Sequence, residues 1–288
     1  MEAQSVLSLT GFAVMSVLLI PACISDWRER EADDRIWAAA GAFGIGSMVC
    51  HSLLAGPRIE HLMMAAGSAM ILADILWERD LPMAAEAAFY SVMTVLFAVP
   101  LLFFRDDPVV LDFLVVPVCY ILFAALFYSG AVVGGADVKC LITLSMVFQN
   151  YPSFLVFPLI DVPSGPISMI LIFPLAVFLF AALASALVAA ALTARNAVRG
   201  DIHRRHMFGG IRMTVERARS AKVWPVQDAE GGGTVPRRVS DGDPGPVYDR
   251  LEAAGVSEVW TTPMVPFLIP ITVSFLSVSL LGNPVFLI

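Results

Sequence analysis

The chain has 288 residues, of which 58% are hydrophobic and only 15% are charged, and its mean hydropathy is +0.79. This composition excludes an ordinary soluble globular protein and is typical of a polytopic membrane protein. The net charge of −7 identifies no partner, because a membrane sorts charged residues by side.

Eight apolar runs predict an all-α bundle of about eight transmembrane helices. A helix needs about 20 residues to cross a bilayer core of about 30 Å. Helices are expected because they satisfy their own backbone polar groups in lipid. Two runs are interrupted by polar residues, the third by Asp74 and the sixth by Asn150 and Pro152. The runs cover residues 5–25, 36–55, 61–77, 86–104, 111–130, 138–160, 167–194 and 264–288.

The distribution of basic residues predicts the orientation. If the N-terminus lies outside and the chain crosses eight times, 16 of the 18 Lys and Arg residues fall on the cytoplasmic side, and only Arg58 and Arg105 lie outside. The first segment, MEAQS, has no basic residue before the first apolar run, so we expect the first helix to be retained and not cleaved as a signal peptide. Both termini are then outside.

Three parts follow from this pattern: a transmembrane bundle over 1–195, a small cytoplasmic α/β insertion over 196–262 and a C-terminal transmembrane helix over 263–288. The insertion holds ten basic and nine acidic residues, which gives no indication of a nucleic-acid groove. Its segments FGGIRMTV and ERARSAKVWPV predict strand and helix fragments around a small core. The Gly-, Pro- and Asp-rich stretch 228–246 predicts a flexible loop.

Cysteine and histidine form no metal-binding or redox pattern in the sequence, and no Gly-x-Ser-x-Gly elbow is present. The cysteines lie in or beside apolar runs without a CxxC pair, and we expect them to act as small apolar side chains. We expect His203 and His206 to be surface residues of the insertion. No metal and no cofactor are therefore expected. The remaining residues of these types are Cys23, Cys50, Cys119, Cys140, His51 and His61.

Two aspartate-bearing segments stand out against the apolar background. ACISDWREREADDRIW, residues 22–37, carries Asp26 at the end of the first expected helix, and GGAD, residues 134–137, ends in Asp137. The expected topology brings both to the cytoplasmic membrane face. Two facing carboxylates share a proton, so one can act as a base on water and the other as an acid toward a scissile amide.

The glycines before Asp137 admit two interpretations. Gly134 and Gly135 tolerate positive φ and close backbone approach, so an extended peptide could lie against them beside the carboxylate. Alternatively they form a plain turn between helices, in which a glycine ends one helix and Asp137 caps the next. These four residues alone leave both interpretations open.

The other aspartates are weaker partners for Asp137. Asp33 and Asp34 are expected on a solvated face, and Asp74 is expected to extend from its membrane end to the interface. The aspartates expected on the outer side, which cannot meet Asp137, are Asp106, Asp107, Asp112 and Asp161.

The segments SDWREREADDRIW and GGADVK resemble the two aspartate motifs of the archaeal preflagellin peptidases, which belong to the prepilin-peptidase branch of the GxGD aspartic proteases. HMFGGIRMTV is similar to the start of that family's cytoplasmic insertion, and VWTTPMVPFLIPITVSF (259–275) is similar to its C-terminal segment. The four segments occur in family order. The resemblance implies that Asp26 and Asp137 are the catalytic pair and that Gly134 and Gly135 are the motif glycines.

The chain departs from the family pattern at two points. Ala136 replaces glycine at the third motif position, where the archaeal branch tolerates a hydrophobic residue. The family core has about six spans, so an extra helix pair is expected within 38–110; a pair returns the chain to the same side and keeps the aspartates together. Because no CxxC is present, neither the zinc site nor the methyltransferase activity of the bacterial branch is implied.

The resemblance implies an aspartic endopeptidase that removes a short basic leader from preflagellins or type IV pilin-like precursors, at the cytoplasmic face of the cell membrane. The acidic residues near Asp26 could attract the leader, or they could form a solvated loop whose charges balance the arginines beside them. These residues are Glu29, Glu31, Asp33 and Asp34.

Two other functions fit the sequence less well. A proton-coupled transporter using membrane-edge carboxylates would need polar residues in mid-span, and the spans are mostly Ala, Val, Leu, Ile and Phe. An intramembrane protease of the presenilin or signal-peptide-peptidase type pairs GxGD with Tyr-Asp and Pro-Ala-Leu motifs. Here Ser25 precedes Asp26, and no Pro-Ala-Leu occurs.

Overall fold

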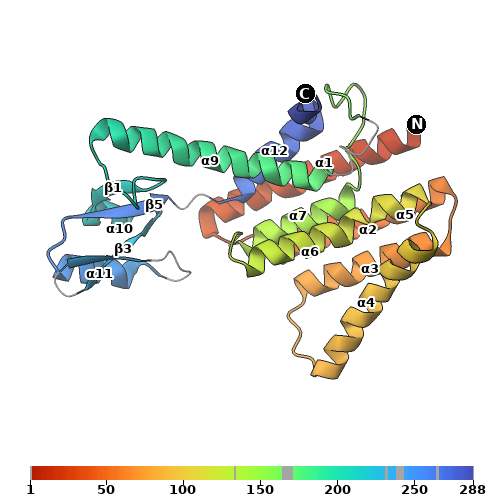
Figure 1. The fold of residues 1–288 in the computed structure, drawn as a ribbon, viewed down its shortest axis with the longest axis horizontal. Helices are drawn as coiled ribbons and strands as arrows, with labels where there is room; N and C mark the ends of the chain where they lie inside the picture. The colour runs from red at the N-terminus through yellow and green to blue at the C-terminus, as the bar shows by residue number, and fades with distance from the viewer. Residues whose placement is uncertain are drawn as a thin grey trace. The chain divides into compact units, whose positions relative to one another are not determined.

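In the computed structural model of the chain (Figure 1), seven helices among the described residues are long and apolar enough to cross a membrane. The expected all-α polytopic membrane fold is thereby confirmed. The structure describes residues 2–132, 134–163, 171–230, 233–237, 243–263 and 266–287. The spans are α1 (Glu2–Glu29), α2 (Asp34–Ala55), α3 (Ile59–Leu76), α4 (Met83–Phe103), α5 (Pro108–Phe113) continued by α6 (Val115–Tyr128), α9 (Phe173–Arg199) and α12 (Leu268–Leu281) continued by η1 (Pro284–Leu287).

The expected span 138–160 is shorter than its apolar run. Helix α7 covers Gly135–Val147, which is 13 residues. At 1.5 Å per residue it is about 20 Å long, less than the bilayer core. The polar and helix-breaking residues Asn150 and Pro152 follow, and the described residues 148–163 contain no helix. Its backbone then pairs with the end of α12, where Leu159 N donates to Leu280 O over 3.1 Å.

The chain divides into two units. The first is Met1–Ala181 together with Pro266–Ile288, and the second is Ala182–Val265. Parts of the expected seventh and eighth spans, residues 167–170, 264–265 and 288, lie outside the described residues.

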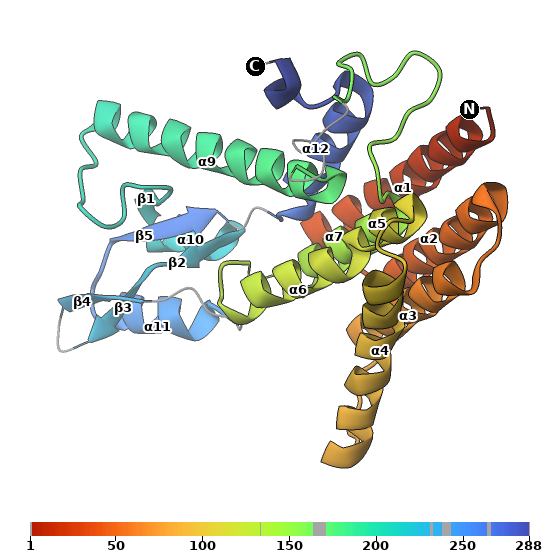
Figure 2. The same ribbon diagram turned by 45° about the vertical axis from the view of Figure 1, so that its right-hand side comes forward.

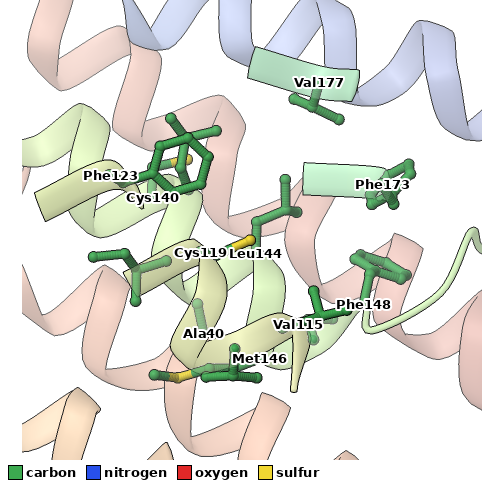
Figure 3. Packing of buried hydrophobic residues seen from close by; sticks show 14 of the residues in the cluster. Ala40, Val115, Cys119, Phe123, Cys140, Leu144, Met146, Phe148, Phe173 and Val177 are labelled. Carbon is green, nitrogen blue, oxygen red and sulfur yellow. The ribbon is translucent and has the colours of Figure 1, made fainter. Parts of the chain in front are cut away.

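Helix α7 lies at the centre of the first unit. It packs between α2 and α6, and α1 packs against α2 and α12 (Figures 1 and 2). From Asp137 to Val147 every residue of α7 except Lys139 is buried. Figure 3 shows this core, where Leu144 lies among side chains of α6 and α9. The Phe148 ring meets the Phe173 ring edge to face at 5.2 Å. The core therefore holds Asp137 in place through the whole of α7.

The hairpin of α3 and α4 lies at the periphery of this unit, within the region 38–110 where an extra helix pair is expected. Only Met93, Phe97 and Pro100 of α4 are buried, and the start of α4 diverges from the other helices in both views (Figure 2). Gly67 of α3 allows the hairpin to close, because a Cβ there would lie 2.7 Å from the Phe97 ring. Small residues at helix contacts are typical of membrane bundles.

The second unit contains a small sheet, as the sequence predicts for the insertion. Strands β1, β5 and β2 form an antiparallel sheet in that order, and β3 pairs with β4. Buried residues such as Val215, Tyr248 and Leu251 form its core. The predicted strand and helix fragments are β1, α10 and β2. The elements are β1 (Ile211–Thr214), α10 (Val215–Ser220), β2 (Val223–Pro225), β3 (Gln227–Glu230), β4 (Gly233–Pro236), α11 (Gly245–Ala253) and β5 (Glu258–Pro263).

Two expectations about the insertion are corrected. The stretch 228–246 is not a loop at its start, because Asp228 pairs with Val235 in the β3–β4 hairpin; positions 231–232 and 238–242 lie outside the described residues. Helix α9 also continues past residue 195 to Arg199. It ends where Gly200 adopts a φ of 75°, a conformation that glycine accepts without strain.

Candidate functional site

Asp26 lies in the last turn of α1 and is partly buried. The helix ends there because Arg30 turns the chain with a φ of 66°, and Arg30 N donates to the Asp26 carbonyl over 3.1 Å. The carboxylate of Asp26 is therefore carried by the last turn of a long membrane helix, just before the short connection to α2.

Asp137 lies in the first turn of α7 and is 7% exposed. Gly134 occupies the N-cap position, so Asp137 does not cap the helix as one interpretation of the sequence supposed. A carboxylate in the first turn is favoured by the partial positive charge of a helix N-terminus. The short helix α7 therefore begins at the aspartate that the sequence singles out.

The structure brings the two aspartates together. Although they are separated by 111 positions in the sequence, the carboxylates of Asp26 and Asp137 lie within electrostatic range of each other. Cys23, one turn before Asp26, contacts α12: its Sγ lies 3.0 Å from Thr272 Oγ1. Helices α1, α7 and α12 thus meet at the pair.

Gly134 leaves room for the carboxylate of Asp137. A Cβ on Gly134 would lie 2.8 Å from Asp137 Cγ and would overlap Oδ2, so any side chain at 134 displaces the carboxylate. A Cβ on Gly135 would meet nothing within 4 Å. Neither glycine has a positive φ. Of the two properties expected of these glycines, positive φ is used by neither, and at Gly134 the absence of a side chain is needed because the Asp137 carboxylate lies against it.

Asp74 is held inside the bundle by hydrogen bonds. Its Oδ2 accepts from Tyr120 Oη over 2.6 Å, and its Oδ1 accepts from Tyr90 Oη over 2.9 Å and from the Arg79 guanidinium. The carboxylate joins α3, α4 and α6. It is 12% exposed; its place at the membrane interface stays a prediction.

The four acidic residues that follow Asp26 differ in their contacts. Asp33 caps α2 by accepting from Arg35 N over 2.9 Å, and Asp34 accepts from Lys139 Nζ of α7 over 2.6 Å. Glu29 and Glu31 are exposed. Only these two are therefore well suited to attract a basic substrate segment.

A polar cavity of about 740 Å³ lies at the other end of α7, and the sequence analysis did not predict it. Residues 147–151 line it, together with Ser47 and His51 of α2 and Asp112 of α5. An adjoining cavity of about 650 Å³ shares Asp112. The signal in the sequence was the run QNYPS at 149–153, which lies within an expected apolar span.

The chemistry available at the aspartate pair is proton transfer. Two carboxylates that interact can hold one proton between them, which allows one to accept a proton while the other donates. The nearest thiols are unsuited to nucleophilic attack, because Cys140 is fully buried and Cys23 is bonded to Thr272 and to the Leu268 carbonyl.

No family model and no curated protein matches the chain. The resemblance to the preflagellin peptidases therefore rests on the four segments of the sequence that carry it.

Proposed function

We propose that the protein is a membrane-embedded aspartic endopeptidase that removes the short basic leader of preflagellins or type IV pilin-like precursors. The observation that carries the proposal is the meeting of Asp26 and Asp137, from the ends of α1 and α7, within electrostatic range at one end of the bundle. The space that Gly134 leaves for the Asp137 carboxylate adds support.

In the proposed reaction the pair shares one proton. The ionised carboxylate takes a proton from water, the water oxygen bonds to the scissile carbonyl carbon, and the other carboxyl group protonates the carbonyl oxygen. The C–N bond then breaks, the leaving amine takes a proton from the pair, and one hydroxyl of the tetrahedral intermediate returns a proton to the pair as the C=O bond forms again. This sequence uses only water and the two aspartates.

The proposed site of action is the cytoplasmic face of the cell membrane. The bias of Lys and Arg residues supports this orientation. A pilin-like precursor presents a basic leader next to an apolar helix, so its cleavage point lies at the membrane surface. The ends of α1 and α7 that carry the aspartates are where such a segment would arrive.

The test is a cleavage assay with a preflagellin-like substrate in membranes that contain wild-type protein, Asp26→Asn or Asp137→Asn. Each substitution is expected to lower the rate by at least about 100-fold, the usual scale for a general acid or base. Asp80→Asn is the matched control, because Asp80 is an exposed aspartate between α3 and α4. Cleavage at the wild-type rate by either Asn variant, inserted normally, would show that the pair is not catalytic.

The leader is proposed to meet Glu29 and Glu31. Replacing both by Gln is expected to raise KM severalfold for a substrate with a basic leader, because exposed charges contribute modest, screened attraction. A substrate with a neutral leader should be unaffected. An unchanged KM for the basic leader would mean that these residues belong to a solvated loop.

A transporter is the second candidate, and the polar cavity beside Asp112 and His51 favours it. Between that cavity and Asp137, however, α7 is filled with buried apolar side chains from Leu141 to Met146. The hydroxyls of Thr143 and Ser145 are bonded to carbonyls of α7 itself. Proton-coupled uptake by proteoliposomes that is lost in Asp112→Asn would favour transport over proteolysis.

A further inference from the structure

A cluster of metal-binding residue types lies far from the aspartate pair, at the end of α2 that contains Ser52. Glu60 and His61 are in the first turn of α3, and Asp107 is the N-cap of α5. Their ligand atoms all lie within 4.8 Å of one another. Ser52 is 18 residues along α2 from Asp34, about 27 Å from that end of the helix. The cluster therefore belongs to a different site.

The three side chains are almost completely buried. Their exposed fractions are 6% for Glu60, 2% for His61 and 8% for Asp107. Acidic residues are rarely buried to this extent unless they are paired or bind a metal. This burial separates the cluster from the exposed acidic groups that are common on protein surfaces.

The ligand atoms are held in position by neighbours that are not ligands. His61 Nδ1 lies 3.1 Å from the buried Ser52 hydroxyl, which fixes the ring and directs Nε2 toward Asp107, also at 3.1 Å. Asp107 Oδ1 accepts from Val109 N over 2.9 Å, which orients its Oδ2. Such supporting hydrogen bonds orient the ligands of metal sites.

The charge of the cluster is incompletely balanced. Arg58 reaches both carboxylates, with its NH1 2.9 Å from Asp107 Oδ2 but 3.9 Å from Glu60 Oε1. The second distance is too long for a hydrogen bond. The Arg58 side chain is 60% exposed, so it can move into solvent without losing buried packing. Among the described residues, only a protonated His61 would, besides Arg58, face the two buried carboxylates as a cation. A divalent cation, bound by the neutral imidazole, would balance both carboxylates.

Two of the three residues, His61 and Asp107, also line a cavity. A cavity of about 450 Å³ is lined by Arg58, His61, Asp106 and Asp107, together with residues of the α4–α5 connection. An ion could enter through it and keep one coordination position open to solvent.

We propose that Glu60, His61 and Asp107 bind a divalent transition-metal ion of the zinc type, and that Arg58 moves into solvent when the ion enters. One imidazole nitrogen and two carboxylate oxygens suit Zn²⁺, which takes three protein ligands and a water in open sites. The ion would join the start of α3 to the start of α5 and so fasten the peripheral hairpin to the bundle. This proposal does not depend on the proposed peptidase activity.

The experiment is a zinc titration of the purified full-length protein after removal of metal with a chelator, followed by calorimetry and by metal analysis after dialysis. All proteins would carry His203→Ala and His206→Ala, because these two rings stack at 4.5 Å and form a second imidazole pair. One Zn²⁺ per chain is expected. No bound zinc at micromolar concentration would overturn the proposal.

Substitutions locate the ion. Glu60→Gln and His61→Ala are each expected to weaken zinc binding by at least about tenfold, the lower end of the effect of even a supporting residue. His51→Ala, a matched histidine on α2 outside the cluster, should bind zinc as before. Equal affinity in Glu60→Gln, His61→Ala and the parent protein would overturn the proposal.

Arg58→Gln separates a metal site from a structural ion-pair network. In a metal site this substitution removes a competing cation and is expected to raise zinc affinity severalfold. In a network that needs Arg58, it lowers stability without raising zinc affinity, and that result would count against the site. The comparison remains decisive even if His61→Ala fails to fold.

Discussion

Asp74 and Asp137 both lie in helices of the membrane bundle, and their surroundings differ. Asp74 accepts hydrogen bonds from two tyrosines and an arginine that come from neighbouring parts of the bundle. Asp137 is more deeply buried, and its charged neighbour is the carboxylate of Asp26. Among the described residues no side chain donates a hydrogen bond to Asp137. A buried carboxylate that stabilises a fold is surrounded by donors, whereas one placed beside a second carboxylate is typical of a functional site.

The largest expected difference is between the effects of Asp74→Asn and Asp137→Asn on the free energy of unfolding. The first substitution leaves the buried Arg79 guanidinium without its charged partner and should cost about 3 kcal/mol of unfolding free energy. The second replaces a carboxylate whose ionised form is disfavoured by burial and by Asp26, so the free energy of unfolding should stay the same or rise. Unfolding of both variants in detergent, compared with wild type, measures the difference. Equal destabilisation would remove the distinction between the two sites.

A smaller contrast tests the glycines beside Asp137. Gly134→Ala should displace the carboxylate and lower the cleavage rate by about 100-fold, the scale of a misplacement of about 1 Å. Gly135→Ala adds the same methyl group where nothing lies within 4 Å, so the protein should fold normally and keep a rate within about threefold. Assays of both variants at equal membrane content make the comparison. An equal loss of cleavage rate in both variants would mean that the glycines make room for the substrate and not for the Asp137 carboxylate.

The smallest expected effect is on the stability of the second unit, through a carboxylate outside the membrane-spanning helices. The pKa of Asp228 is lowered by its two hydrogen bonds from Arg250, at 2.6 and 3.0 Å. A lowered pKa in the folded state adds stability at neutral pH that is lost as the pH falls below the usual range near 4. Because Arg250 is half exposed, solvent screens the pair and its contribution to the free energy of unfolding should be small. Arg250→Gln should therefore make residues 227–253 more sensitive to proteolysis at pH 7, and the difference from wild type should vanish near pH 3.

Much of this architecture could be predicted from the sequence, because long apolar runs have few alternatives to helices in lipid. The segments that carry Asp26 and Asp137 were identifiable for the same reason, since charged residues stand out in such runs. The end of α7 at Val147 was missed because the residues on both sides of QNYPS are apolar, and together they predict one continuous span over 138–160. The tyrosines that donate to Asp74 come from other helices. Such tertiary contacts cannot be predicted from the local sequence around Asp74.

Other misses have a local cause. The β3–β4 hairpin was read as a loop because its strands contain Gly, Pro and Asp, residues that are rare in strands. The sequence suggested positive φ or close approach of a backbone for Gly134, as it does for any glycine. That the side chain of Asp137 fills the space beside Gly134 appears only in three dimensions. Glu60, His61 and Asp107 were separated by the helices between them, so their cluster had no sequence signature.

The shortness of α7 has a consequence for how the protein is made. A segment of 13 residues is too short to partition stably into a bilayer by its own hydrophobicity. Its insertion must then depend on helices that are synthesised before it, above all α2 and α6, between which it packs. We expect α7, and Asp137 with it, to enter the membrane only after α2 and α6 have inserted. The proposed catalytic pair would therefore form after the earlier helices have passed through the insertion machinery.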